Sequence, residues 1–536
     1  MGSEKTAFPI LDDAQTETLK TYGEIWKTEV GQTLFEVGDP TYRFIVILSG
    51  KVAVVERLGD EENVIAESEE RSFLGELNML TNQAVYLTAV VREAGEVIAI
   101  APASLRDIIA SEPELSDLIL GAFIARRELI VARSSAFLRL IGPRYSGDTL
   151  RLREFMVRNR LSHLWLEPTE DAAQDLLERF NLEAKDAPFV VWQDREVLTN
   201  PSLGELAKTI GLDLQVSDDH TFDLIVVGAG PAGLAASVYG ASEGLSTVTV
   251  ESIATGGQAG TSSKIENYLG FPAGLSGAEL SSRAEVQALK FGARITVPRS
   301  AQGLEREGEC YSVTLDDEST LTGRSVVIAT GARYRKLDVP RLEEFEGAGI
   351  YYAATDIEAR LCKGDEVIVV GGGNSAGQAA AFLSRHAKKV HVMIRGDDLG
   401  KSMSRYLLSR IEASADIEVH HHTEIAELHG DERLTGVTVE NNQTHERARL
   451  DVAGVFTFIG AVPHTEWLDG TLALDEKGFV LTGEDAAEGD ERRMLLETTL
   501  PGVFAVGDVR SNSVKRVASA VGEGSIVVRF IHDALA

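Results

Sequence analysis

The chain has 536 residues, 44% of them hydrophobic, with 52 Lys and Arg against 83 Asp and Glu and a formal net charge of −31. This length predicts several domains, and the excess of acid argues against a nucleic-acid partner, which would need clustered cations. The only cysteines, Cys310 and Cys362, are too few for a disulfide scaffold or a Cys-ligated metal site. Because no signal peptide is recognisable and glycines and a proline interrupt the apolar stretch 224–238, we expect a cytoplasmic protein without a membrane partner.

Residues 1–140 are expected to form a β-rich domain that ends in helices. Short apolar runs between glycine turns predict the strands, and helical periodicity predicts the segments that follow. The expected strands are 30–35, 43–48, 51–56 and 97–100, and the expected helices are 105–110 and 114–134.

The sequence FLGELNMLTNQ and the β-rich run before it resemble the cyclic-nucleotide-binding β-roll. The resemblance implies that Gly75, Glu76 and Leu77 form the turn that holds the ribose. It also implies that an arginine ten residues after the glycine pairs with the cyclic phosphate, but Val85 occupies that position. Because an apolar side chain cannot neutralise a phosphate, we expect weak or no cyclic-nucleotide binding unless another cation, such as Arg92, takes this role.

Residues 141–217 predict a small α/β domain, with a helix that ends at Phe180 and a strand introduced by Pro188. The order of elements resembles a glutaredoxin or thioredoxin fold, which carries a Cys-x-x-Cys pair at its first helix. The corresponding segment here, GPRYSGDT, has no cysteine. Without a thiolate nucleophile, this domain is expected to have a structural or docking role.

A strand, a Gly-x-Gly-x-x-Gly turn and a helix begin at residue 222. Gly228 allows the tight turn, Gly230 lets a diphosphate approach backbone N–H groups, and Gly233 lets the helix pack on the strand. The next strand ends in Glu251, whose carboxylate can accept hydrogen bonds from both ribose hydroxyls. This pattern predicts a dinucleotide site with the diphosphate at the helix N-terminus.

The same pattern recurs at 366–395, with Gly371, Gly373 and Ala376 in the glycine positions and Arg395 at the end of the second strand. An acid suits a free ribose 2′-hydroxyl, whereas a cation suits a 2′-phosphate. The sequence therefore favours NADPH at this second site, with NADH as the alternative.

Five further segments, GGQAGTSSKIENYLGF, VVIATGARYRKL, DVAGVFTFIGAVPHT, PGVFAVGDVR and KRVASAVGEGS, resemble the low-molecular-weight thioredoxin reductases in order and spacing. The resemblance implies FAD at the first site, in an FAD-binding domain of 221–340 and 457–536 around an NAD(P)-binding domain of 341–456. The further FAD contacts that it implies are Gly257, Gln258, Asn267, Thr330, Gly331, Asp508, Arg516, Val517 and Ala518. The predicted fold class is therefore multidomain α/β: a β-roll with helices, a small thioredoxin-like domain and a two-dinucleotide-binding, Rossmann-like flavoprotein fold.

The redox-active cysteine pair of the thioredoxin reductases is missing from this chain. Its two positions hold Ala353 and Asp356, and neither side chain can form the thiolate that disulfide exchange requires. Cys362 is expected to be a packing residue. We therefore expect no catalytic side chain and no disulfide relay through these positions.

Taken with the resemblance, the sequence predicts an NAD(P)H-dependent FAD oxidoreductase in which a hydride passes from the nicotinamide to the flavin, which then reduces an acceptor directly. The candidate acceptors are a ferredoxin, a flavodoxin, a quinone or a small disulfide. The alternative is a sensor in which the β-roll binds a ligand or partner and the redox state of the flavin is the signal. The resemblance also implies a homodimer.

Three consecutive histidines, His420, His421 and His422, lie in an expected strand. Successive side chains of a strand point to opposite faces, so two imidazoles could face one metal ion. No third ligand with suitable spacing accompanies them in the sequence. The sequence therefore predicts an exposed strand end and no metal site.

Overall fold

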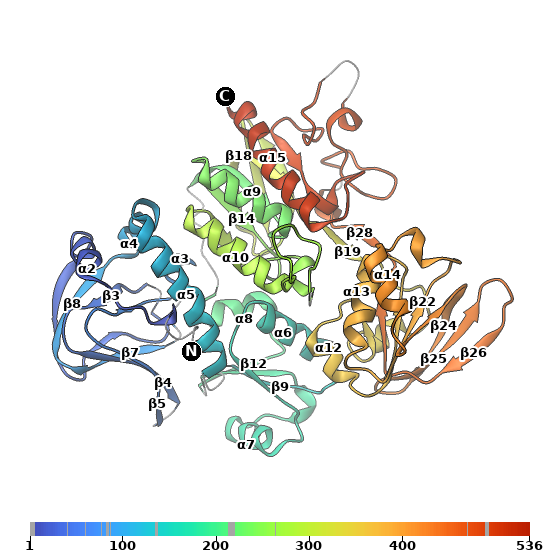
Figure 1. The fold of residues 1–536 in the computed structure, drawn as a ribbon, viewed down its shortest axis with the longest axis horizontal. Helices are drawn as coiled ribbons and strands as arrows, with labels where there is room; N and C mark the ends of the chain where they lie inside the picture. The colour runs from blue at the N-terminus through green and yellow to red at the C-terminus, as the bar shows by residue number, and fades with distance from the viewer. Residues whose placement is uncertain are drawn as a thin grey trace.

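The computed structural model describes residues 6–536 except 40, 59–60, 77, 82–84, 86, 134–137, 194, 213–219, 263, 469 and 488–491. In Figure 1 a β-rich unit lies at the left, a strand–helix unit at the upper centre, a smaller unit below it and a second strand–helix unit at the right. We call these the roll (13–133), the first Rossmann unit (221–334 and 461–535), the small unit (138–209) and the second Rossmann unit (342–457). The chain thus has the mixed α/β multidomain fold predicted from its sequence.

The roll consists of two four-stranded sheets and the helices around them. Its elements are α2 (Asp13–Lys20), β1 (Glu24–Thr28), β2 (Thr33–Phe35), β3 (Phe44–Ile47), β4 (Lys51–Leu58), β5 (Glu61–Ser68), β6 (Phe73–Leu74), α3 (Asn78–Thr81), β7 (Thr88–Glu93), β8 (Gly95–Ile100), α4 (Pro102–Ser111) and α5 (Pro113–Arg133). The antiparallel sheets have the orders β1-β8-β3-β6 and β2-β7-β4-β5. The strand expected at 30–35 begins only at Thr33, because Gly31 has a φ of +85° and the N–H of Gln32 closes a turn onto the carbonyl of Glu29 at 3.0 Å.

The small unit is one mixed sheet with helices. Its elements are β9 (Leu138–Ile141), α6 (Gly147–Arg158), β10 (His163–Leu166), α7 (Asp171–Phe180), the 3₁₀ turn η1 (Ala184–Asp186), β11 (Phe189–Trp192), β12 (Glu196–Thr199) and α8 (Leu203–Thr209). The order is β10-β9-β11-β12, with β10 parallel and β11 antiparallel to β9. Helix α7 ends where Asn181 takes a left-handed conformation, and Ser202 and Glu205 form a capping box at α8. Asp218 and Asp219, which separate this unit from the next in the sequence, lie outside the described residues.

The first Rossmann unit is built on a long, largely parallel sheet. Its elements are β13 (Thr221–Val227), α9 (Pro231–Ser242), β14 (Thr247–Val250), η2 (Ala259–Thr261), α10 (Gly277–Lys290), β15 (Arg294–Thr296), β16 (Ala301–Glu307), β17 (Cys310–Leu315), β18 (Thr320–Ile328), β19 (Ala332–Tyr334), β28 (Ala461–Pro463), η4 (Glu466–Leu468), η5 (Gly483–Ala486), β29 (Val503–Ala505), η6 (Gly507–Val509) and α15 (Val517–Leu535). The order is β15-β14-β13-β18-β17-β16, with β29 beside β18. Residues 224–227 of β13 are all buried, as expected for a central parallel strand.

The second Rossmann unit is inserted between β19 and β28, which pair with each other where the chain leaves and re-enters the first unit. Its elements are α11 (Leu342–Phe345), β20 (Ile350–Tyr351), α12 (Asp356–Leu361), β21 (Glu366–Val370), α13 (Asn374–Leu383), β22 (Lys389–Met393), η3 (Leu399–Lys401), α14 (Arg405–Glu412), β23 (Ile417–His420), β24 (Thr423–Gly430), β25 (Leu434–Asn441), β26 (Arg447–Leu450) and β27 (Gly454–Thr457). A parallel sheet, β20-β27-β21-β22-β23, packs on the antiparallel sheet β24-β25-β26 through a shared apolar core.

One hydrophobic core continues from the roll into the first Rossmann unit. Leu234 and Val238 of α9 and Val286 and Leu289 of α10 belong to the same buried cluster as the β-strands of the roll. Helices α3 and α4 of the roll also contact α10. The roll is therefore packed directly on the helix that follows the first glycine turn and on its neighbour.

Within the residues that the structure describes, no helix is both long enough and apolar enough to cross a bilayer.

Candidate functional site

The first glycine turn, between β13 and α9, is closely packed at its first and third glycines and open at its second. Gly228 has a φ of +106°, and a Cβ on it would lie 2.4 Å from the Ala329 carbonyl oxygen. A Cβ on Gly233 would lie 1.8 Å from the Gly228 carbonyl oxygen. At Gly230, in contrast, the nearest atom to a Cβ would be the Gly257 Cα at 3.9 Å. The turn thus leaves open space at its second glycine, which fits the diphosphate expected there.

Glu251 follows β14 and is only 8% exposed. One carboxylate oxygen accepts a hydrogen bond from the backbone N–H of Ala229 at 2.8 Å, and the other accepts one from the N–H of Ile253 at 3.1 Å. These bonds fix the carboxylate beside the glycine turn. A buried, ionisable acceptor in this place fits a ribose that donates hydrogen bonds from its hydroxyls.

A cavity of about 1400 Å³ extends from this turn between the two Rossmann units and the small unit. Its size exceeds the roughly 300–1,000 Å³ of a typical single-ligand pocket, so it has room for more than one ligand group. The sequence-predicted residues that line it are Gly228, Gly230, Glu251, Gly257, Gln258, Asn267, Thr330, Gly331, Ala353, Asp356, Asp508, Arg516, Val517 and Ala518. The predicted residues that do not line it are Gly233, Gly371, Gly373, Ala376 and Arg395.

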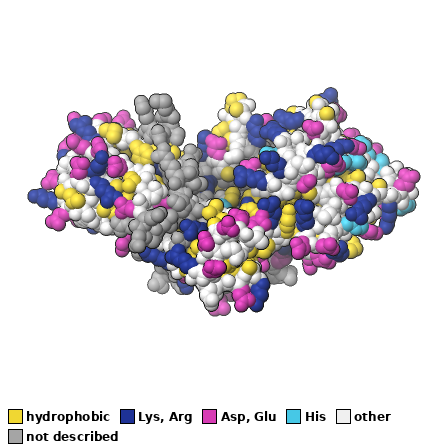
Figure 2. All heavy atoms as spheres, turned by 90° about the horizontal axis from the view of Figure 1, so that it is seen from below, with side chains coloured by type: hydrophobic (Ala, Val, Ile, Leu, Met, Phe, Trp, Pro, Cys, Tyr) yellow, Lys and Arg dark blue, Asp and Glu magenta, His cyan; other side chains and the backbone are white. Residues whose placement is uncertain are grey.

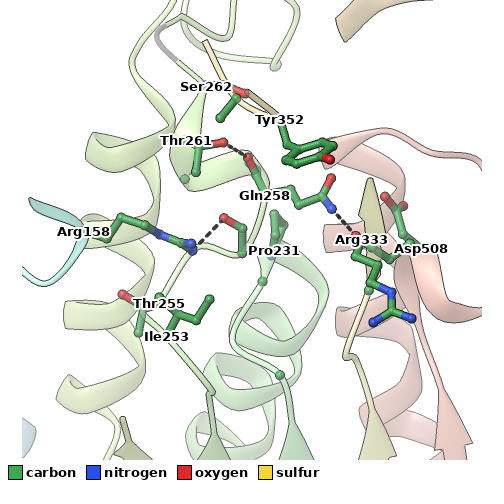
Figure 3. Close-up of a pocket in the computed structure, with 18 of the residues that line it drawn as sticks. Arg158, Pro231, Ile253, Thr255, Gln258, Thr261, Ser262, Arg333, Tyr352 and Asp508 are labelled. Atoms are coloured by element: carbon green, nitrogen blue, oxygen red, sulfur yellow. Dashed lines mark hydrogen bonds between the residues drawn. The ribbon is translucent and has the colours of Figure 1, made fainter. Parts of the chain in front are cut away.

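The loop after Glu251 forms one wall of the cavity. The side-chain amide of Gln258 donates a hydrogen bond to the carbonyl of Ala332, and the hydroxyl of Thr261 donates one to the carbonyl of Gln258 at 2.8 Å. Figure 3 shows Gln258 between Thr261 on one side and Asp508 on the other, with Tyr352 nearby. The first bond holds the loop against the segment that follows β18, and the second lies within the loop.

The opposite wall is formed by η6 and the start of α15. Burial raises the pKa of Asp508, while the charge of Lys515 opposes that shift. The Lys515 ammonium donates to the Asp508 carbonyl oxygen at 2.5 Å, and burial lowers the pKa of Lys515. An Arg510–Glu523 ion pair of 2.6 Å ties η6 to α15. The first residues of α15 border the cavity, so the positive end of the helix dipole faces the place where an anionic group is expected.

The second glycine turn has a backbone geometry similar to that of the first. Gly371 has a φ of +137°, and a Cβ on it would lie 2.3 Å from the Phe458 carbonyl oxygen. A Cβ on Gly373 would meet no atom within 4 Å. Asn374 and Ser375 at the start of α13 line the same cavity as the first turn. The two expected dinucleotide sites therefore border one space.

Arg395 lies away from this cavity, two residues after the end of β22. Its side chain is 71% exposed, and its Nε lies 3.6 Å from the Glu424 carboxylate. The contact is too long for a strong hydrogen bond. The guanidinium is thus available to a ligand that reaches the surface of the second Rossmann unit.

Helix α6 of the small unit contacts loops of both Rossmann units, which no sequence signal indicates. In Figure 3 Arg158 points from α6 toward the first glycine turn. Its guanidinium donates to the Gly257 carbonyl at 3.1 Å, and the Asn159 amide donates to the Ile253 carbonyl at 2.9 Å. Toward the second Rossmann unit, Leu150 packs with Ala354 against the core of that unit. Helix α6 therefore forms a third wall of the cavity and links the two nucleotide units.

The positions of the missing cysteines lie beside α6, at the start of α12. Asp356 is exposed, Ala353 is half-buried, and both line the cavity. Cys362, at the end of α12, is 1% exposed, and burial raises the pKa of its thiol to about 12, with smaller contributions from Asp365 and Glu358. Cys310 lies in β17, in the other Rossmann unit, and both thiols are free.

In the roll, the cations beside the expected ribose turn come from α5. Arg127 lies 3.9 Å from the Glu76 carboxylate, and Arg126 donates to the Gly75 carbonyl at 2.8 Å. Burial raises the pKa of Glu76, although both arginine charges oppose the shift. Sequence reasoning missed these arginines because α5 starts far from the turn in sequence.

The other residues of the expected phosphate position have different partners. Val85 is 3% exposed and exchanges backbone hydrogen bonds with Gly38 and Asp39. Arg92, the alternative cation, pairs with Glu62. Leu77 lies outside the described residues.

Comparison with known proteins gives two family matches. The family described as pyridine nucleotide-disulphide oxidoreductase matches residues 222–524, and the cyclic nucleotide-binding domain family matches residues 26–112.

Similar individual proteins cover the C-terminal part of the chain. The thioredoxin reductase of Mycolicibacterium smegmatis is 35% identical over 302 residues, which are 56% of this chain and 93% of that protein. Crystal structures of the thioredoxin reductases of Lactococcus lactis and of T. acidophilum each match with a TM-score of 0.54 and 29% identity. Each covers 59% of this chain, and the chain covers 99% of the first and 100% of the second.

Proposed function

The chain belongs to the pyridine nucleotide-disulphide oxidoreductase family and is an FAD-dependent NAD(P)H oxidoreductase with an N-terminal cyclic nucleotide-binding domain, and from this premise we propose that its flavin reduces an acceptor directly, without a cysteine relay. The observation that carries the proposal is the pair Ala353 and Asp356 beside the cavity. Cys362 does not replace the missing pair, because a buried thiol with a pKa near 12 is protonated at neutral pH and the thiolate is the nucleophile.

The residues of the cavity would bind and orient the two cofactors. Bound NADPH supplies a hydride, and bound FAD accepts it and can release the electrons singly or as a pair. The open space at Gly230 admits a diphosphate to the start of α9, and Glu251 holds the ribose of the same nucleotide. The start of α15 lies where it can stabilise negative charge on a reduced ring. Asn374 and Ser375 orient the second nucleotide toward the same space.

The proposed acceptor is a ferredoxin, a flavodoxin, a quinone or a small disulfide that takes electrons at the cavity. Helix α6 lies along the segment where thiol relay residues would stand, which supports an acceptor that reacts with the ring itself. On this proposal the chain divides into residues 1–140, 141–217, an FAD-binding domain of 221–340 and 457–536, and an NAD(P)-binding domain of 341–456.

The test is anaerobic reduction followed by acceptor screening. Purified full-length protein should be yellow and release FAD rather than FMN on denaturation. NADPH should bleach the flavin, and ferredoxins, flavodoxins, quinones, small disulfides and thioredoxin should then be tested for reoxidation. Multiple turnover with one of the first four, without thioredoxin reduction, is the expected result. Efficient reduction of thioredoxin would contradict the proposal.

A second candidate, a flavin-based sensor, is favoured by the contact between the roll and the first Rossmann unit. Helix α3, which follows the Gly75–Glu76 turn, touches α10, and the two units share a core. A conformational change in the roll would therefore reach α10, which packs against α9, the helix that follows the first glycine turn. Tightly held flavin, a low rate with every acceptor and a rate that changes when the roll binds a ligand would favour the sensor over the enzyme.

A further inference from the structure

A cluster of histidine and glutamate side chains lies at one edge of the second Rossmann unit, apart from the cavity. The Nδ1 atom of His391 in β22 lies 2.9 Å from the Nε2 atom of His420 in β23, and the Glu418 Oε1 atom lies 3.8 Å from that Nε2. One ligand atom from each of the three residues lies within 4.8 Å of the others. Figure 2 shows histidines gathered over the end of the molecule that Figure 1 assigns to β22–β26.

Pairing of adjacent strands brings this cluster together. Glu418 and His420 are two residues apart in β23 and therefore point to the same face. His391 is paired directly with Glu418 in the parallel ladder between β22 and β23. His391 is 29 residues from His420 in the sequence, so only this ladder brings the two imidazoles together.

The contacts of His391 suit a metal ligand. Its Nε2 lies 3.1 Å from the Oε2 atom of Glu366, which makes this nitrogen the donor and leaves the lone pair on Nδ1 facing His420. A carboxylate behind a metal-binding imidazole fixes the tautomer and the ring orientation in many metal sites. The His391 side chain is only 5% exposed, so its ring is also held by packing.

Two lysines orient the carboxylates without covering the ligand atoms. Lys389 pairs with the Oε2 atom of Glu418, which leaves Oε1 toward His420. Lys388 pairs with the Oε1 atom of Glu366 at 2.9 Å, which leaves Oε2 for His391. In each carboxylate, therefore, one oxygen contacts a lysine and the other faces a histidine of the cluster.

We propose that His391 Nδ1, His420 Nε2 and Glu418 Oε1 bind one divalent transition-metal ion of the Zn²⁺ type. Two imidazole nitrogens and one carboxylate oxygen form a common zinc donor set, and tetrahedral bonds of about 2.0–2.1 Å place ligand atoms about 3.3 Å apart. The observed separations of 2.9 and 3.8 Å lie on either side of that value. The Glu418 side chain is 47% exposed and can move to close the longer separation. A fourth position is left for water.

The site is separate from the proposed redox reaction. His391, Glu418 and His420 do not line the cavity. A bound ion would join β22 to β23, which is the edge strand of the sheet. Its expected effect is on the stability of the second Rossmann unit, and flavin reduction by NADPH should proceed with or without it.

The test is titration of tag-free, chelator-treated, full-length holoprotein with Zn²⁺ by calorimetry, together with thermal unfolding with and without Zn²⁺. We expect one equivalent bound per chain at micromolar or tighter affinity and a rise in the unfolding temperature. His420→Ala should abolish this binding, and Glu418→Gln should weaken it at least tenfold. Glu366→Gln, which removes the charge behind His391 and also the ion pair with Lys388, should weaken it about 10- to 100-fold.

The matched control is His445→Ala. His445 forms a 3.0 Å contact with Glu440 in the same unit but does not belong to the cluster. This variant should bind Zn²⁺ as the wild type does. Flavin content and circular dichroism establish that each variant is folded, and Glu418→Gln, at a partly exposed side chain, is the variant that keeps the test valid if His420→Ala unfolds. Absence of stoichiometric binding by the wild type, or equal affinities in the wild type and Glu418→Gln, would leave a plain His420-to-His391 hydrogen bond and overturn the proposal.

Discussion

The two glycine turns of the molecule have nearly the same backbone and different surroundings. At both, the first glycine has a positive φ, and a Cβ would lie 2.4 or 2.3 Å from a carbonyl oxygen of a neighbouring segment. After the first turn, Glu251 is buried and accepts two backbone hydrogen bonds. After the second turn, the Arg395 side chain is 71% exposed, and its Nε atom lies 3.6 Å from the Glu424 carboxylate.

The difference in surroundings separates a retained cofactor from an exchanging one. The first turn is enclosed by the Gln258 loop, by α15 and by α6, whose Arg158 is bonded to the backbone of that loop. A nucleotide there would be held by many buried contacts and released slowly. At the second site Arg395, which is expected to contact the 2′-phosphate, is exposed. This exposure suits a nucleotide that binds and leaves in each turnover.

Substitution of the second glycine of each turn should distinguish the retained nucleotide from the exchanging one most clearly. A Cβ at Gly230 or at Gly373 meets open space in the chain itself, so alanine at either position should leave the fold intact and obstruct only the nucleotide. Gly230→Ala should yield colourless protein with no NADPH oxidation. Gly373→Ala should stay yellow and lose NADPH affinity. Flavin content and the NADPH dependence of bleaching are the measurements.

The control for this pair is Gly233→Ala, where a Cβ would lie 1.8 Å from a carbonyl oxygen and the fold itself should be destabilised. If Gly373→Ala also lost its flavin, the division between a retained and an exchanging nucleotide would be wrong.

Arg395→Ala should distinguish the two nicotinamide nucleotides. A charge-assisted hydrogen bond to a phosphate supports an affinity difference of about ten- to hundredfold. The variant should therefore weaken NADPH binding by that factor and leave NADH binding nearly unchanged. Lys401→Ala is the matched control, because Lys401 is an exposed cation nearby that pairs with Asp397 at 2.6 Å. Equal losses for NADPH and NADH would show that Arg395 does not read the 2′-phosphate.

The thiols should contribute little to turnover. Cys310→Ser combined with Cys362→Ser should leave NADPH-to-dye electron transfer nearly intact, because a dye takes electrons from the flavin itself. Activity must be expressed per bound flavin, since Cys362 is packed in a core. Loss of turnover at full flavin content in this double variant is the contradicting outcome.

The pKa of Cys362 adds a pH test. Burial raises it to about 12, so the folded state favours the neutral thiol, and this contribution to stability is present below the ordinary thiol pKa of about 8.5 and lost as pH rises through 12. Iodoacetamide at a pH of about 8.5 should alkylate Cys310 and spare Cys362 in folded protein, which peptide mass spectrometry measures. Rapid labelling of Cys362 would show that its site is open.

The smallest expected effect is the binding of cyclic nucleotides to the roll. Because Val85 is buried at the expected phosphate position and arginines of α5 already lie beside Glu76, cyclic AMP and cyclic GMP should bind weakly or not at all. Calorimetry on the full chain measures this, and micromolar or tighter binding would show that a cation such as Arg126 or Arg127 rearranges to accept the phosphate.

Residues close together in sequence could be interpreted without a structure. The glycine turns, the order of strand and helix around them and the replacement of the cysteine pair by Ala353 and Asp356 are all local patterns. Each depends on backbone geometry or on side-chain chemistry within a few residues, and this is why the family and the fold class followed from the sequence. The start of β2 was the local exception, because Gly31 bends the chain before Thr33.

Only the tertiary structure decided which distant segments meet. The contact of Arg158 with the Gly257 carbonyl, the arginines of α5 beside Glu76 and the meeting of His391 with His420 each join residues that are 29 to 99 positions apart or come from separate units. Such contacts arise from the packing of whole elements, which leaves no periodic pattern in the sequence. The nucleotide turns were therefore determined locally, whereas the third wall of the cavity and the proposed metal site exist only because particular helices and strands pack side by side.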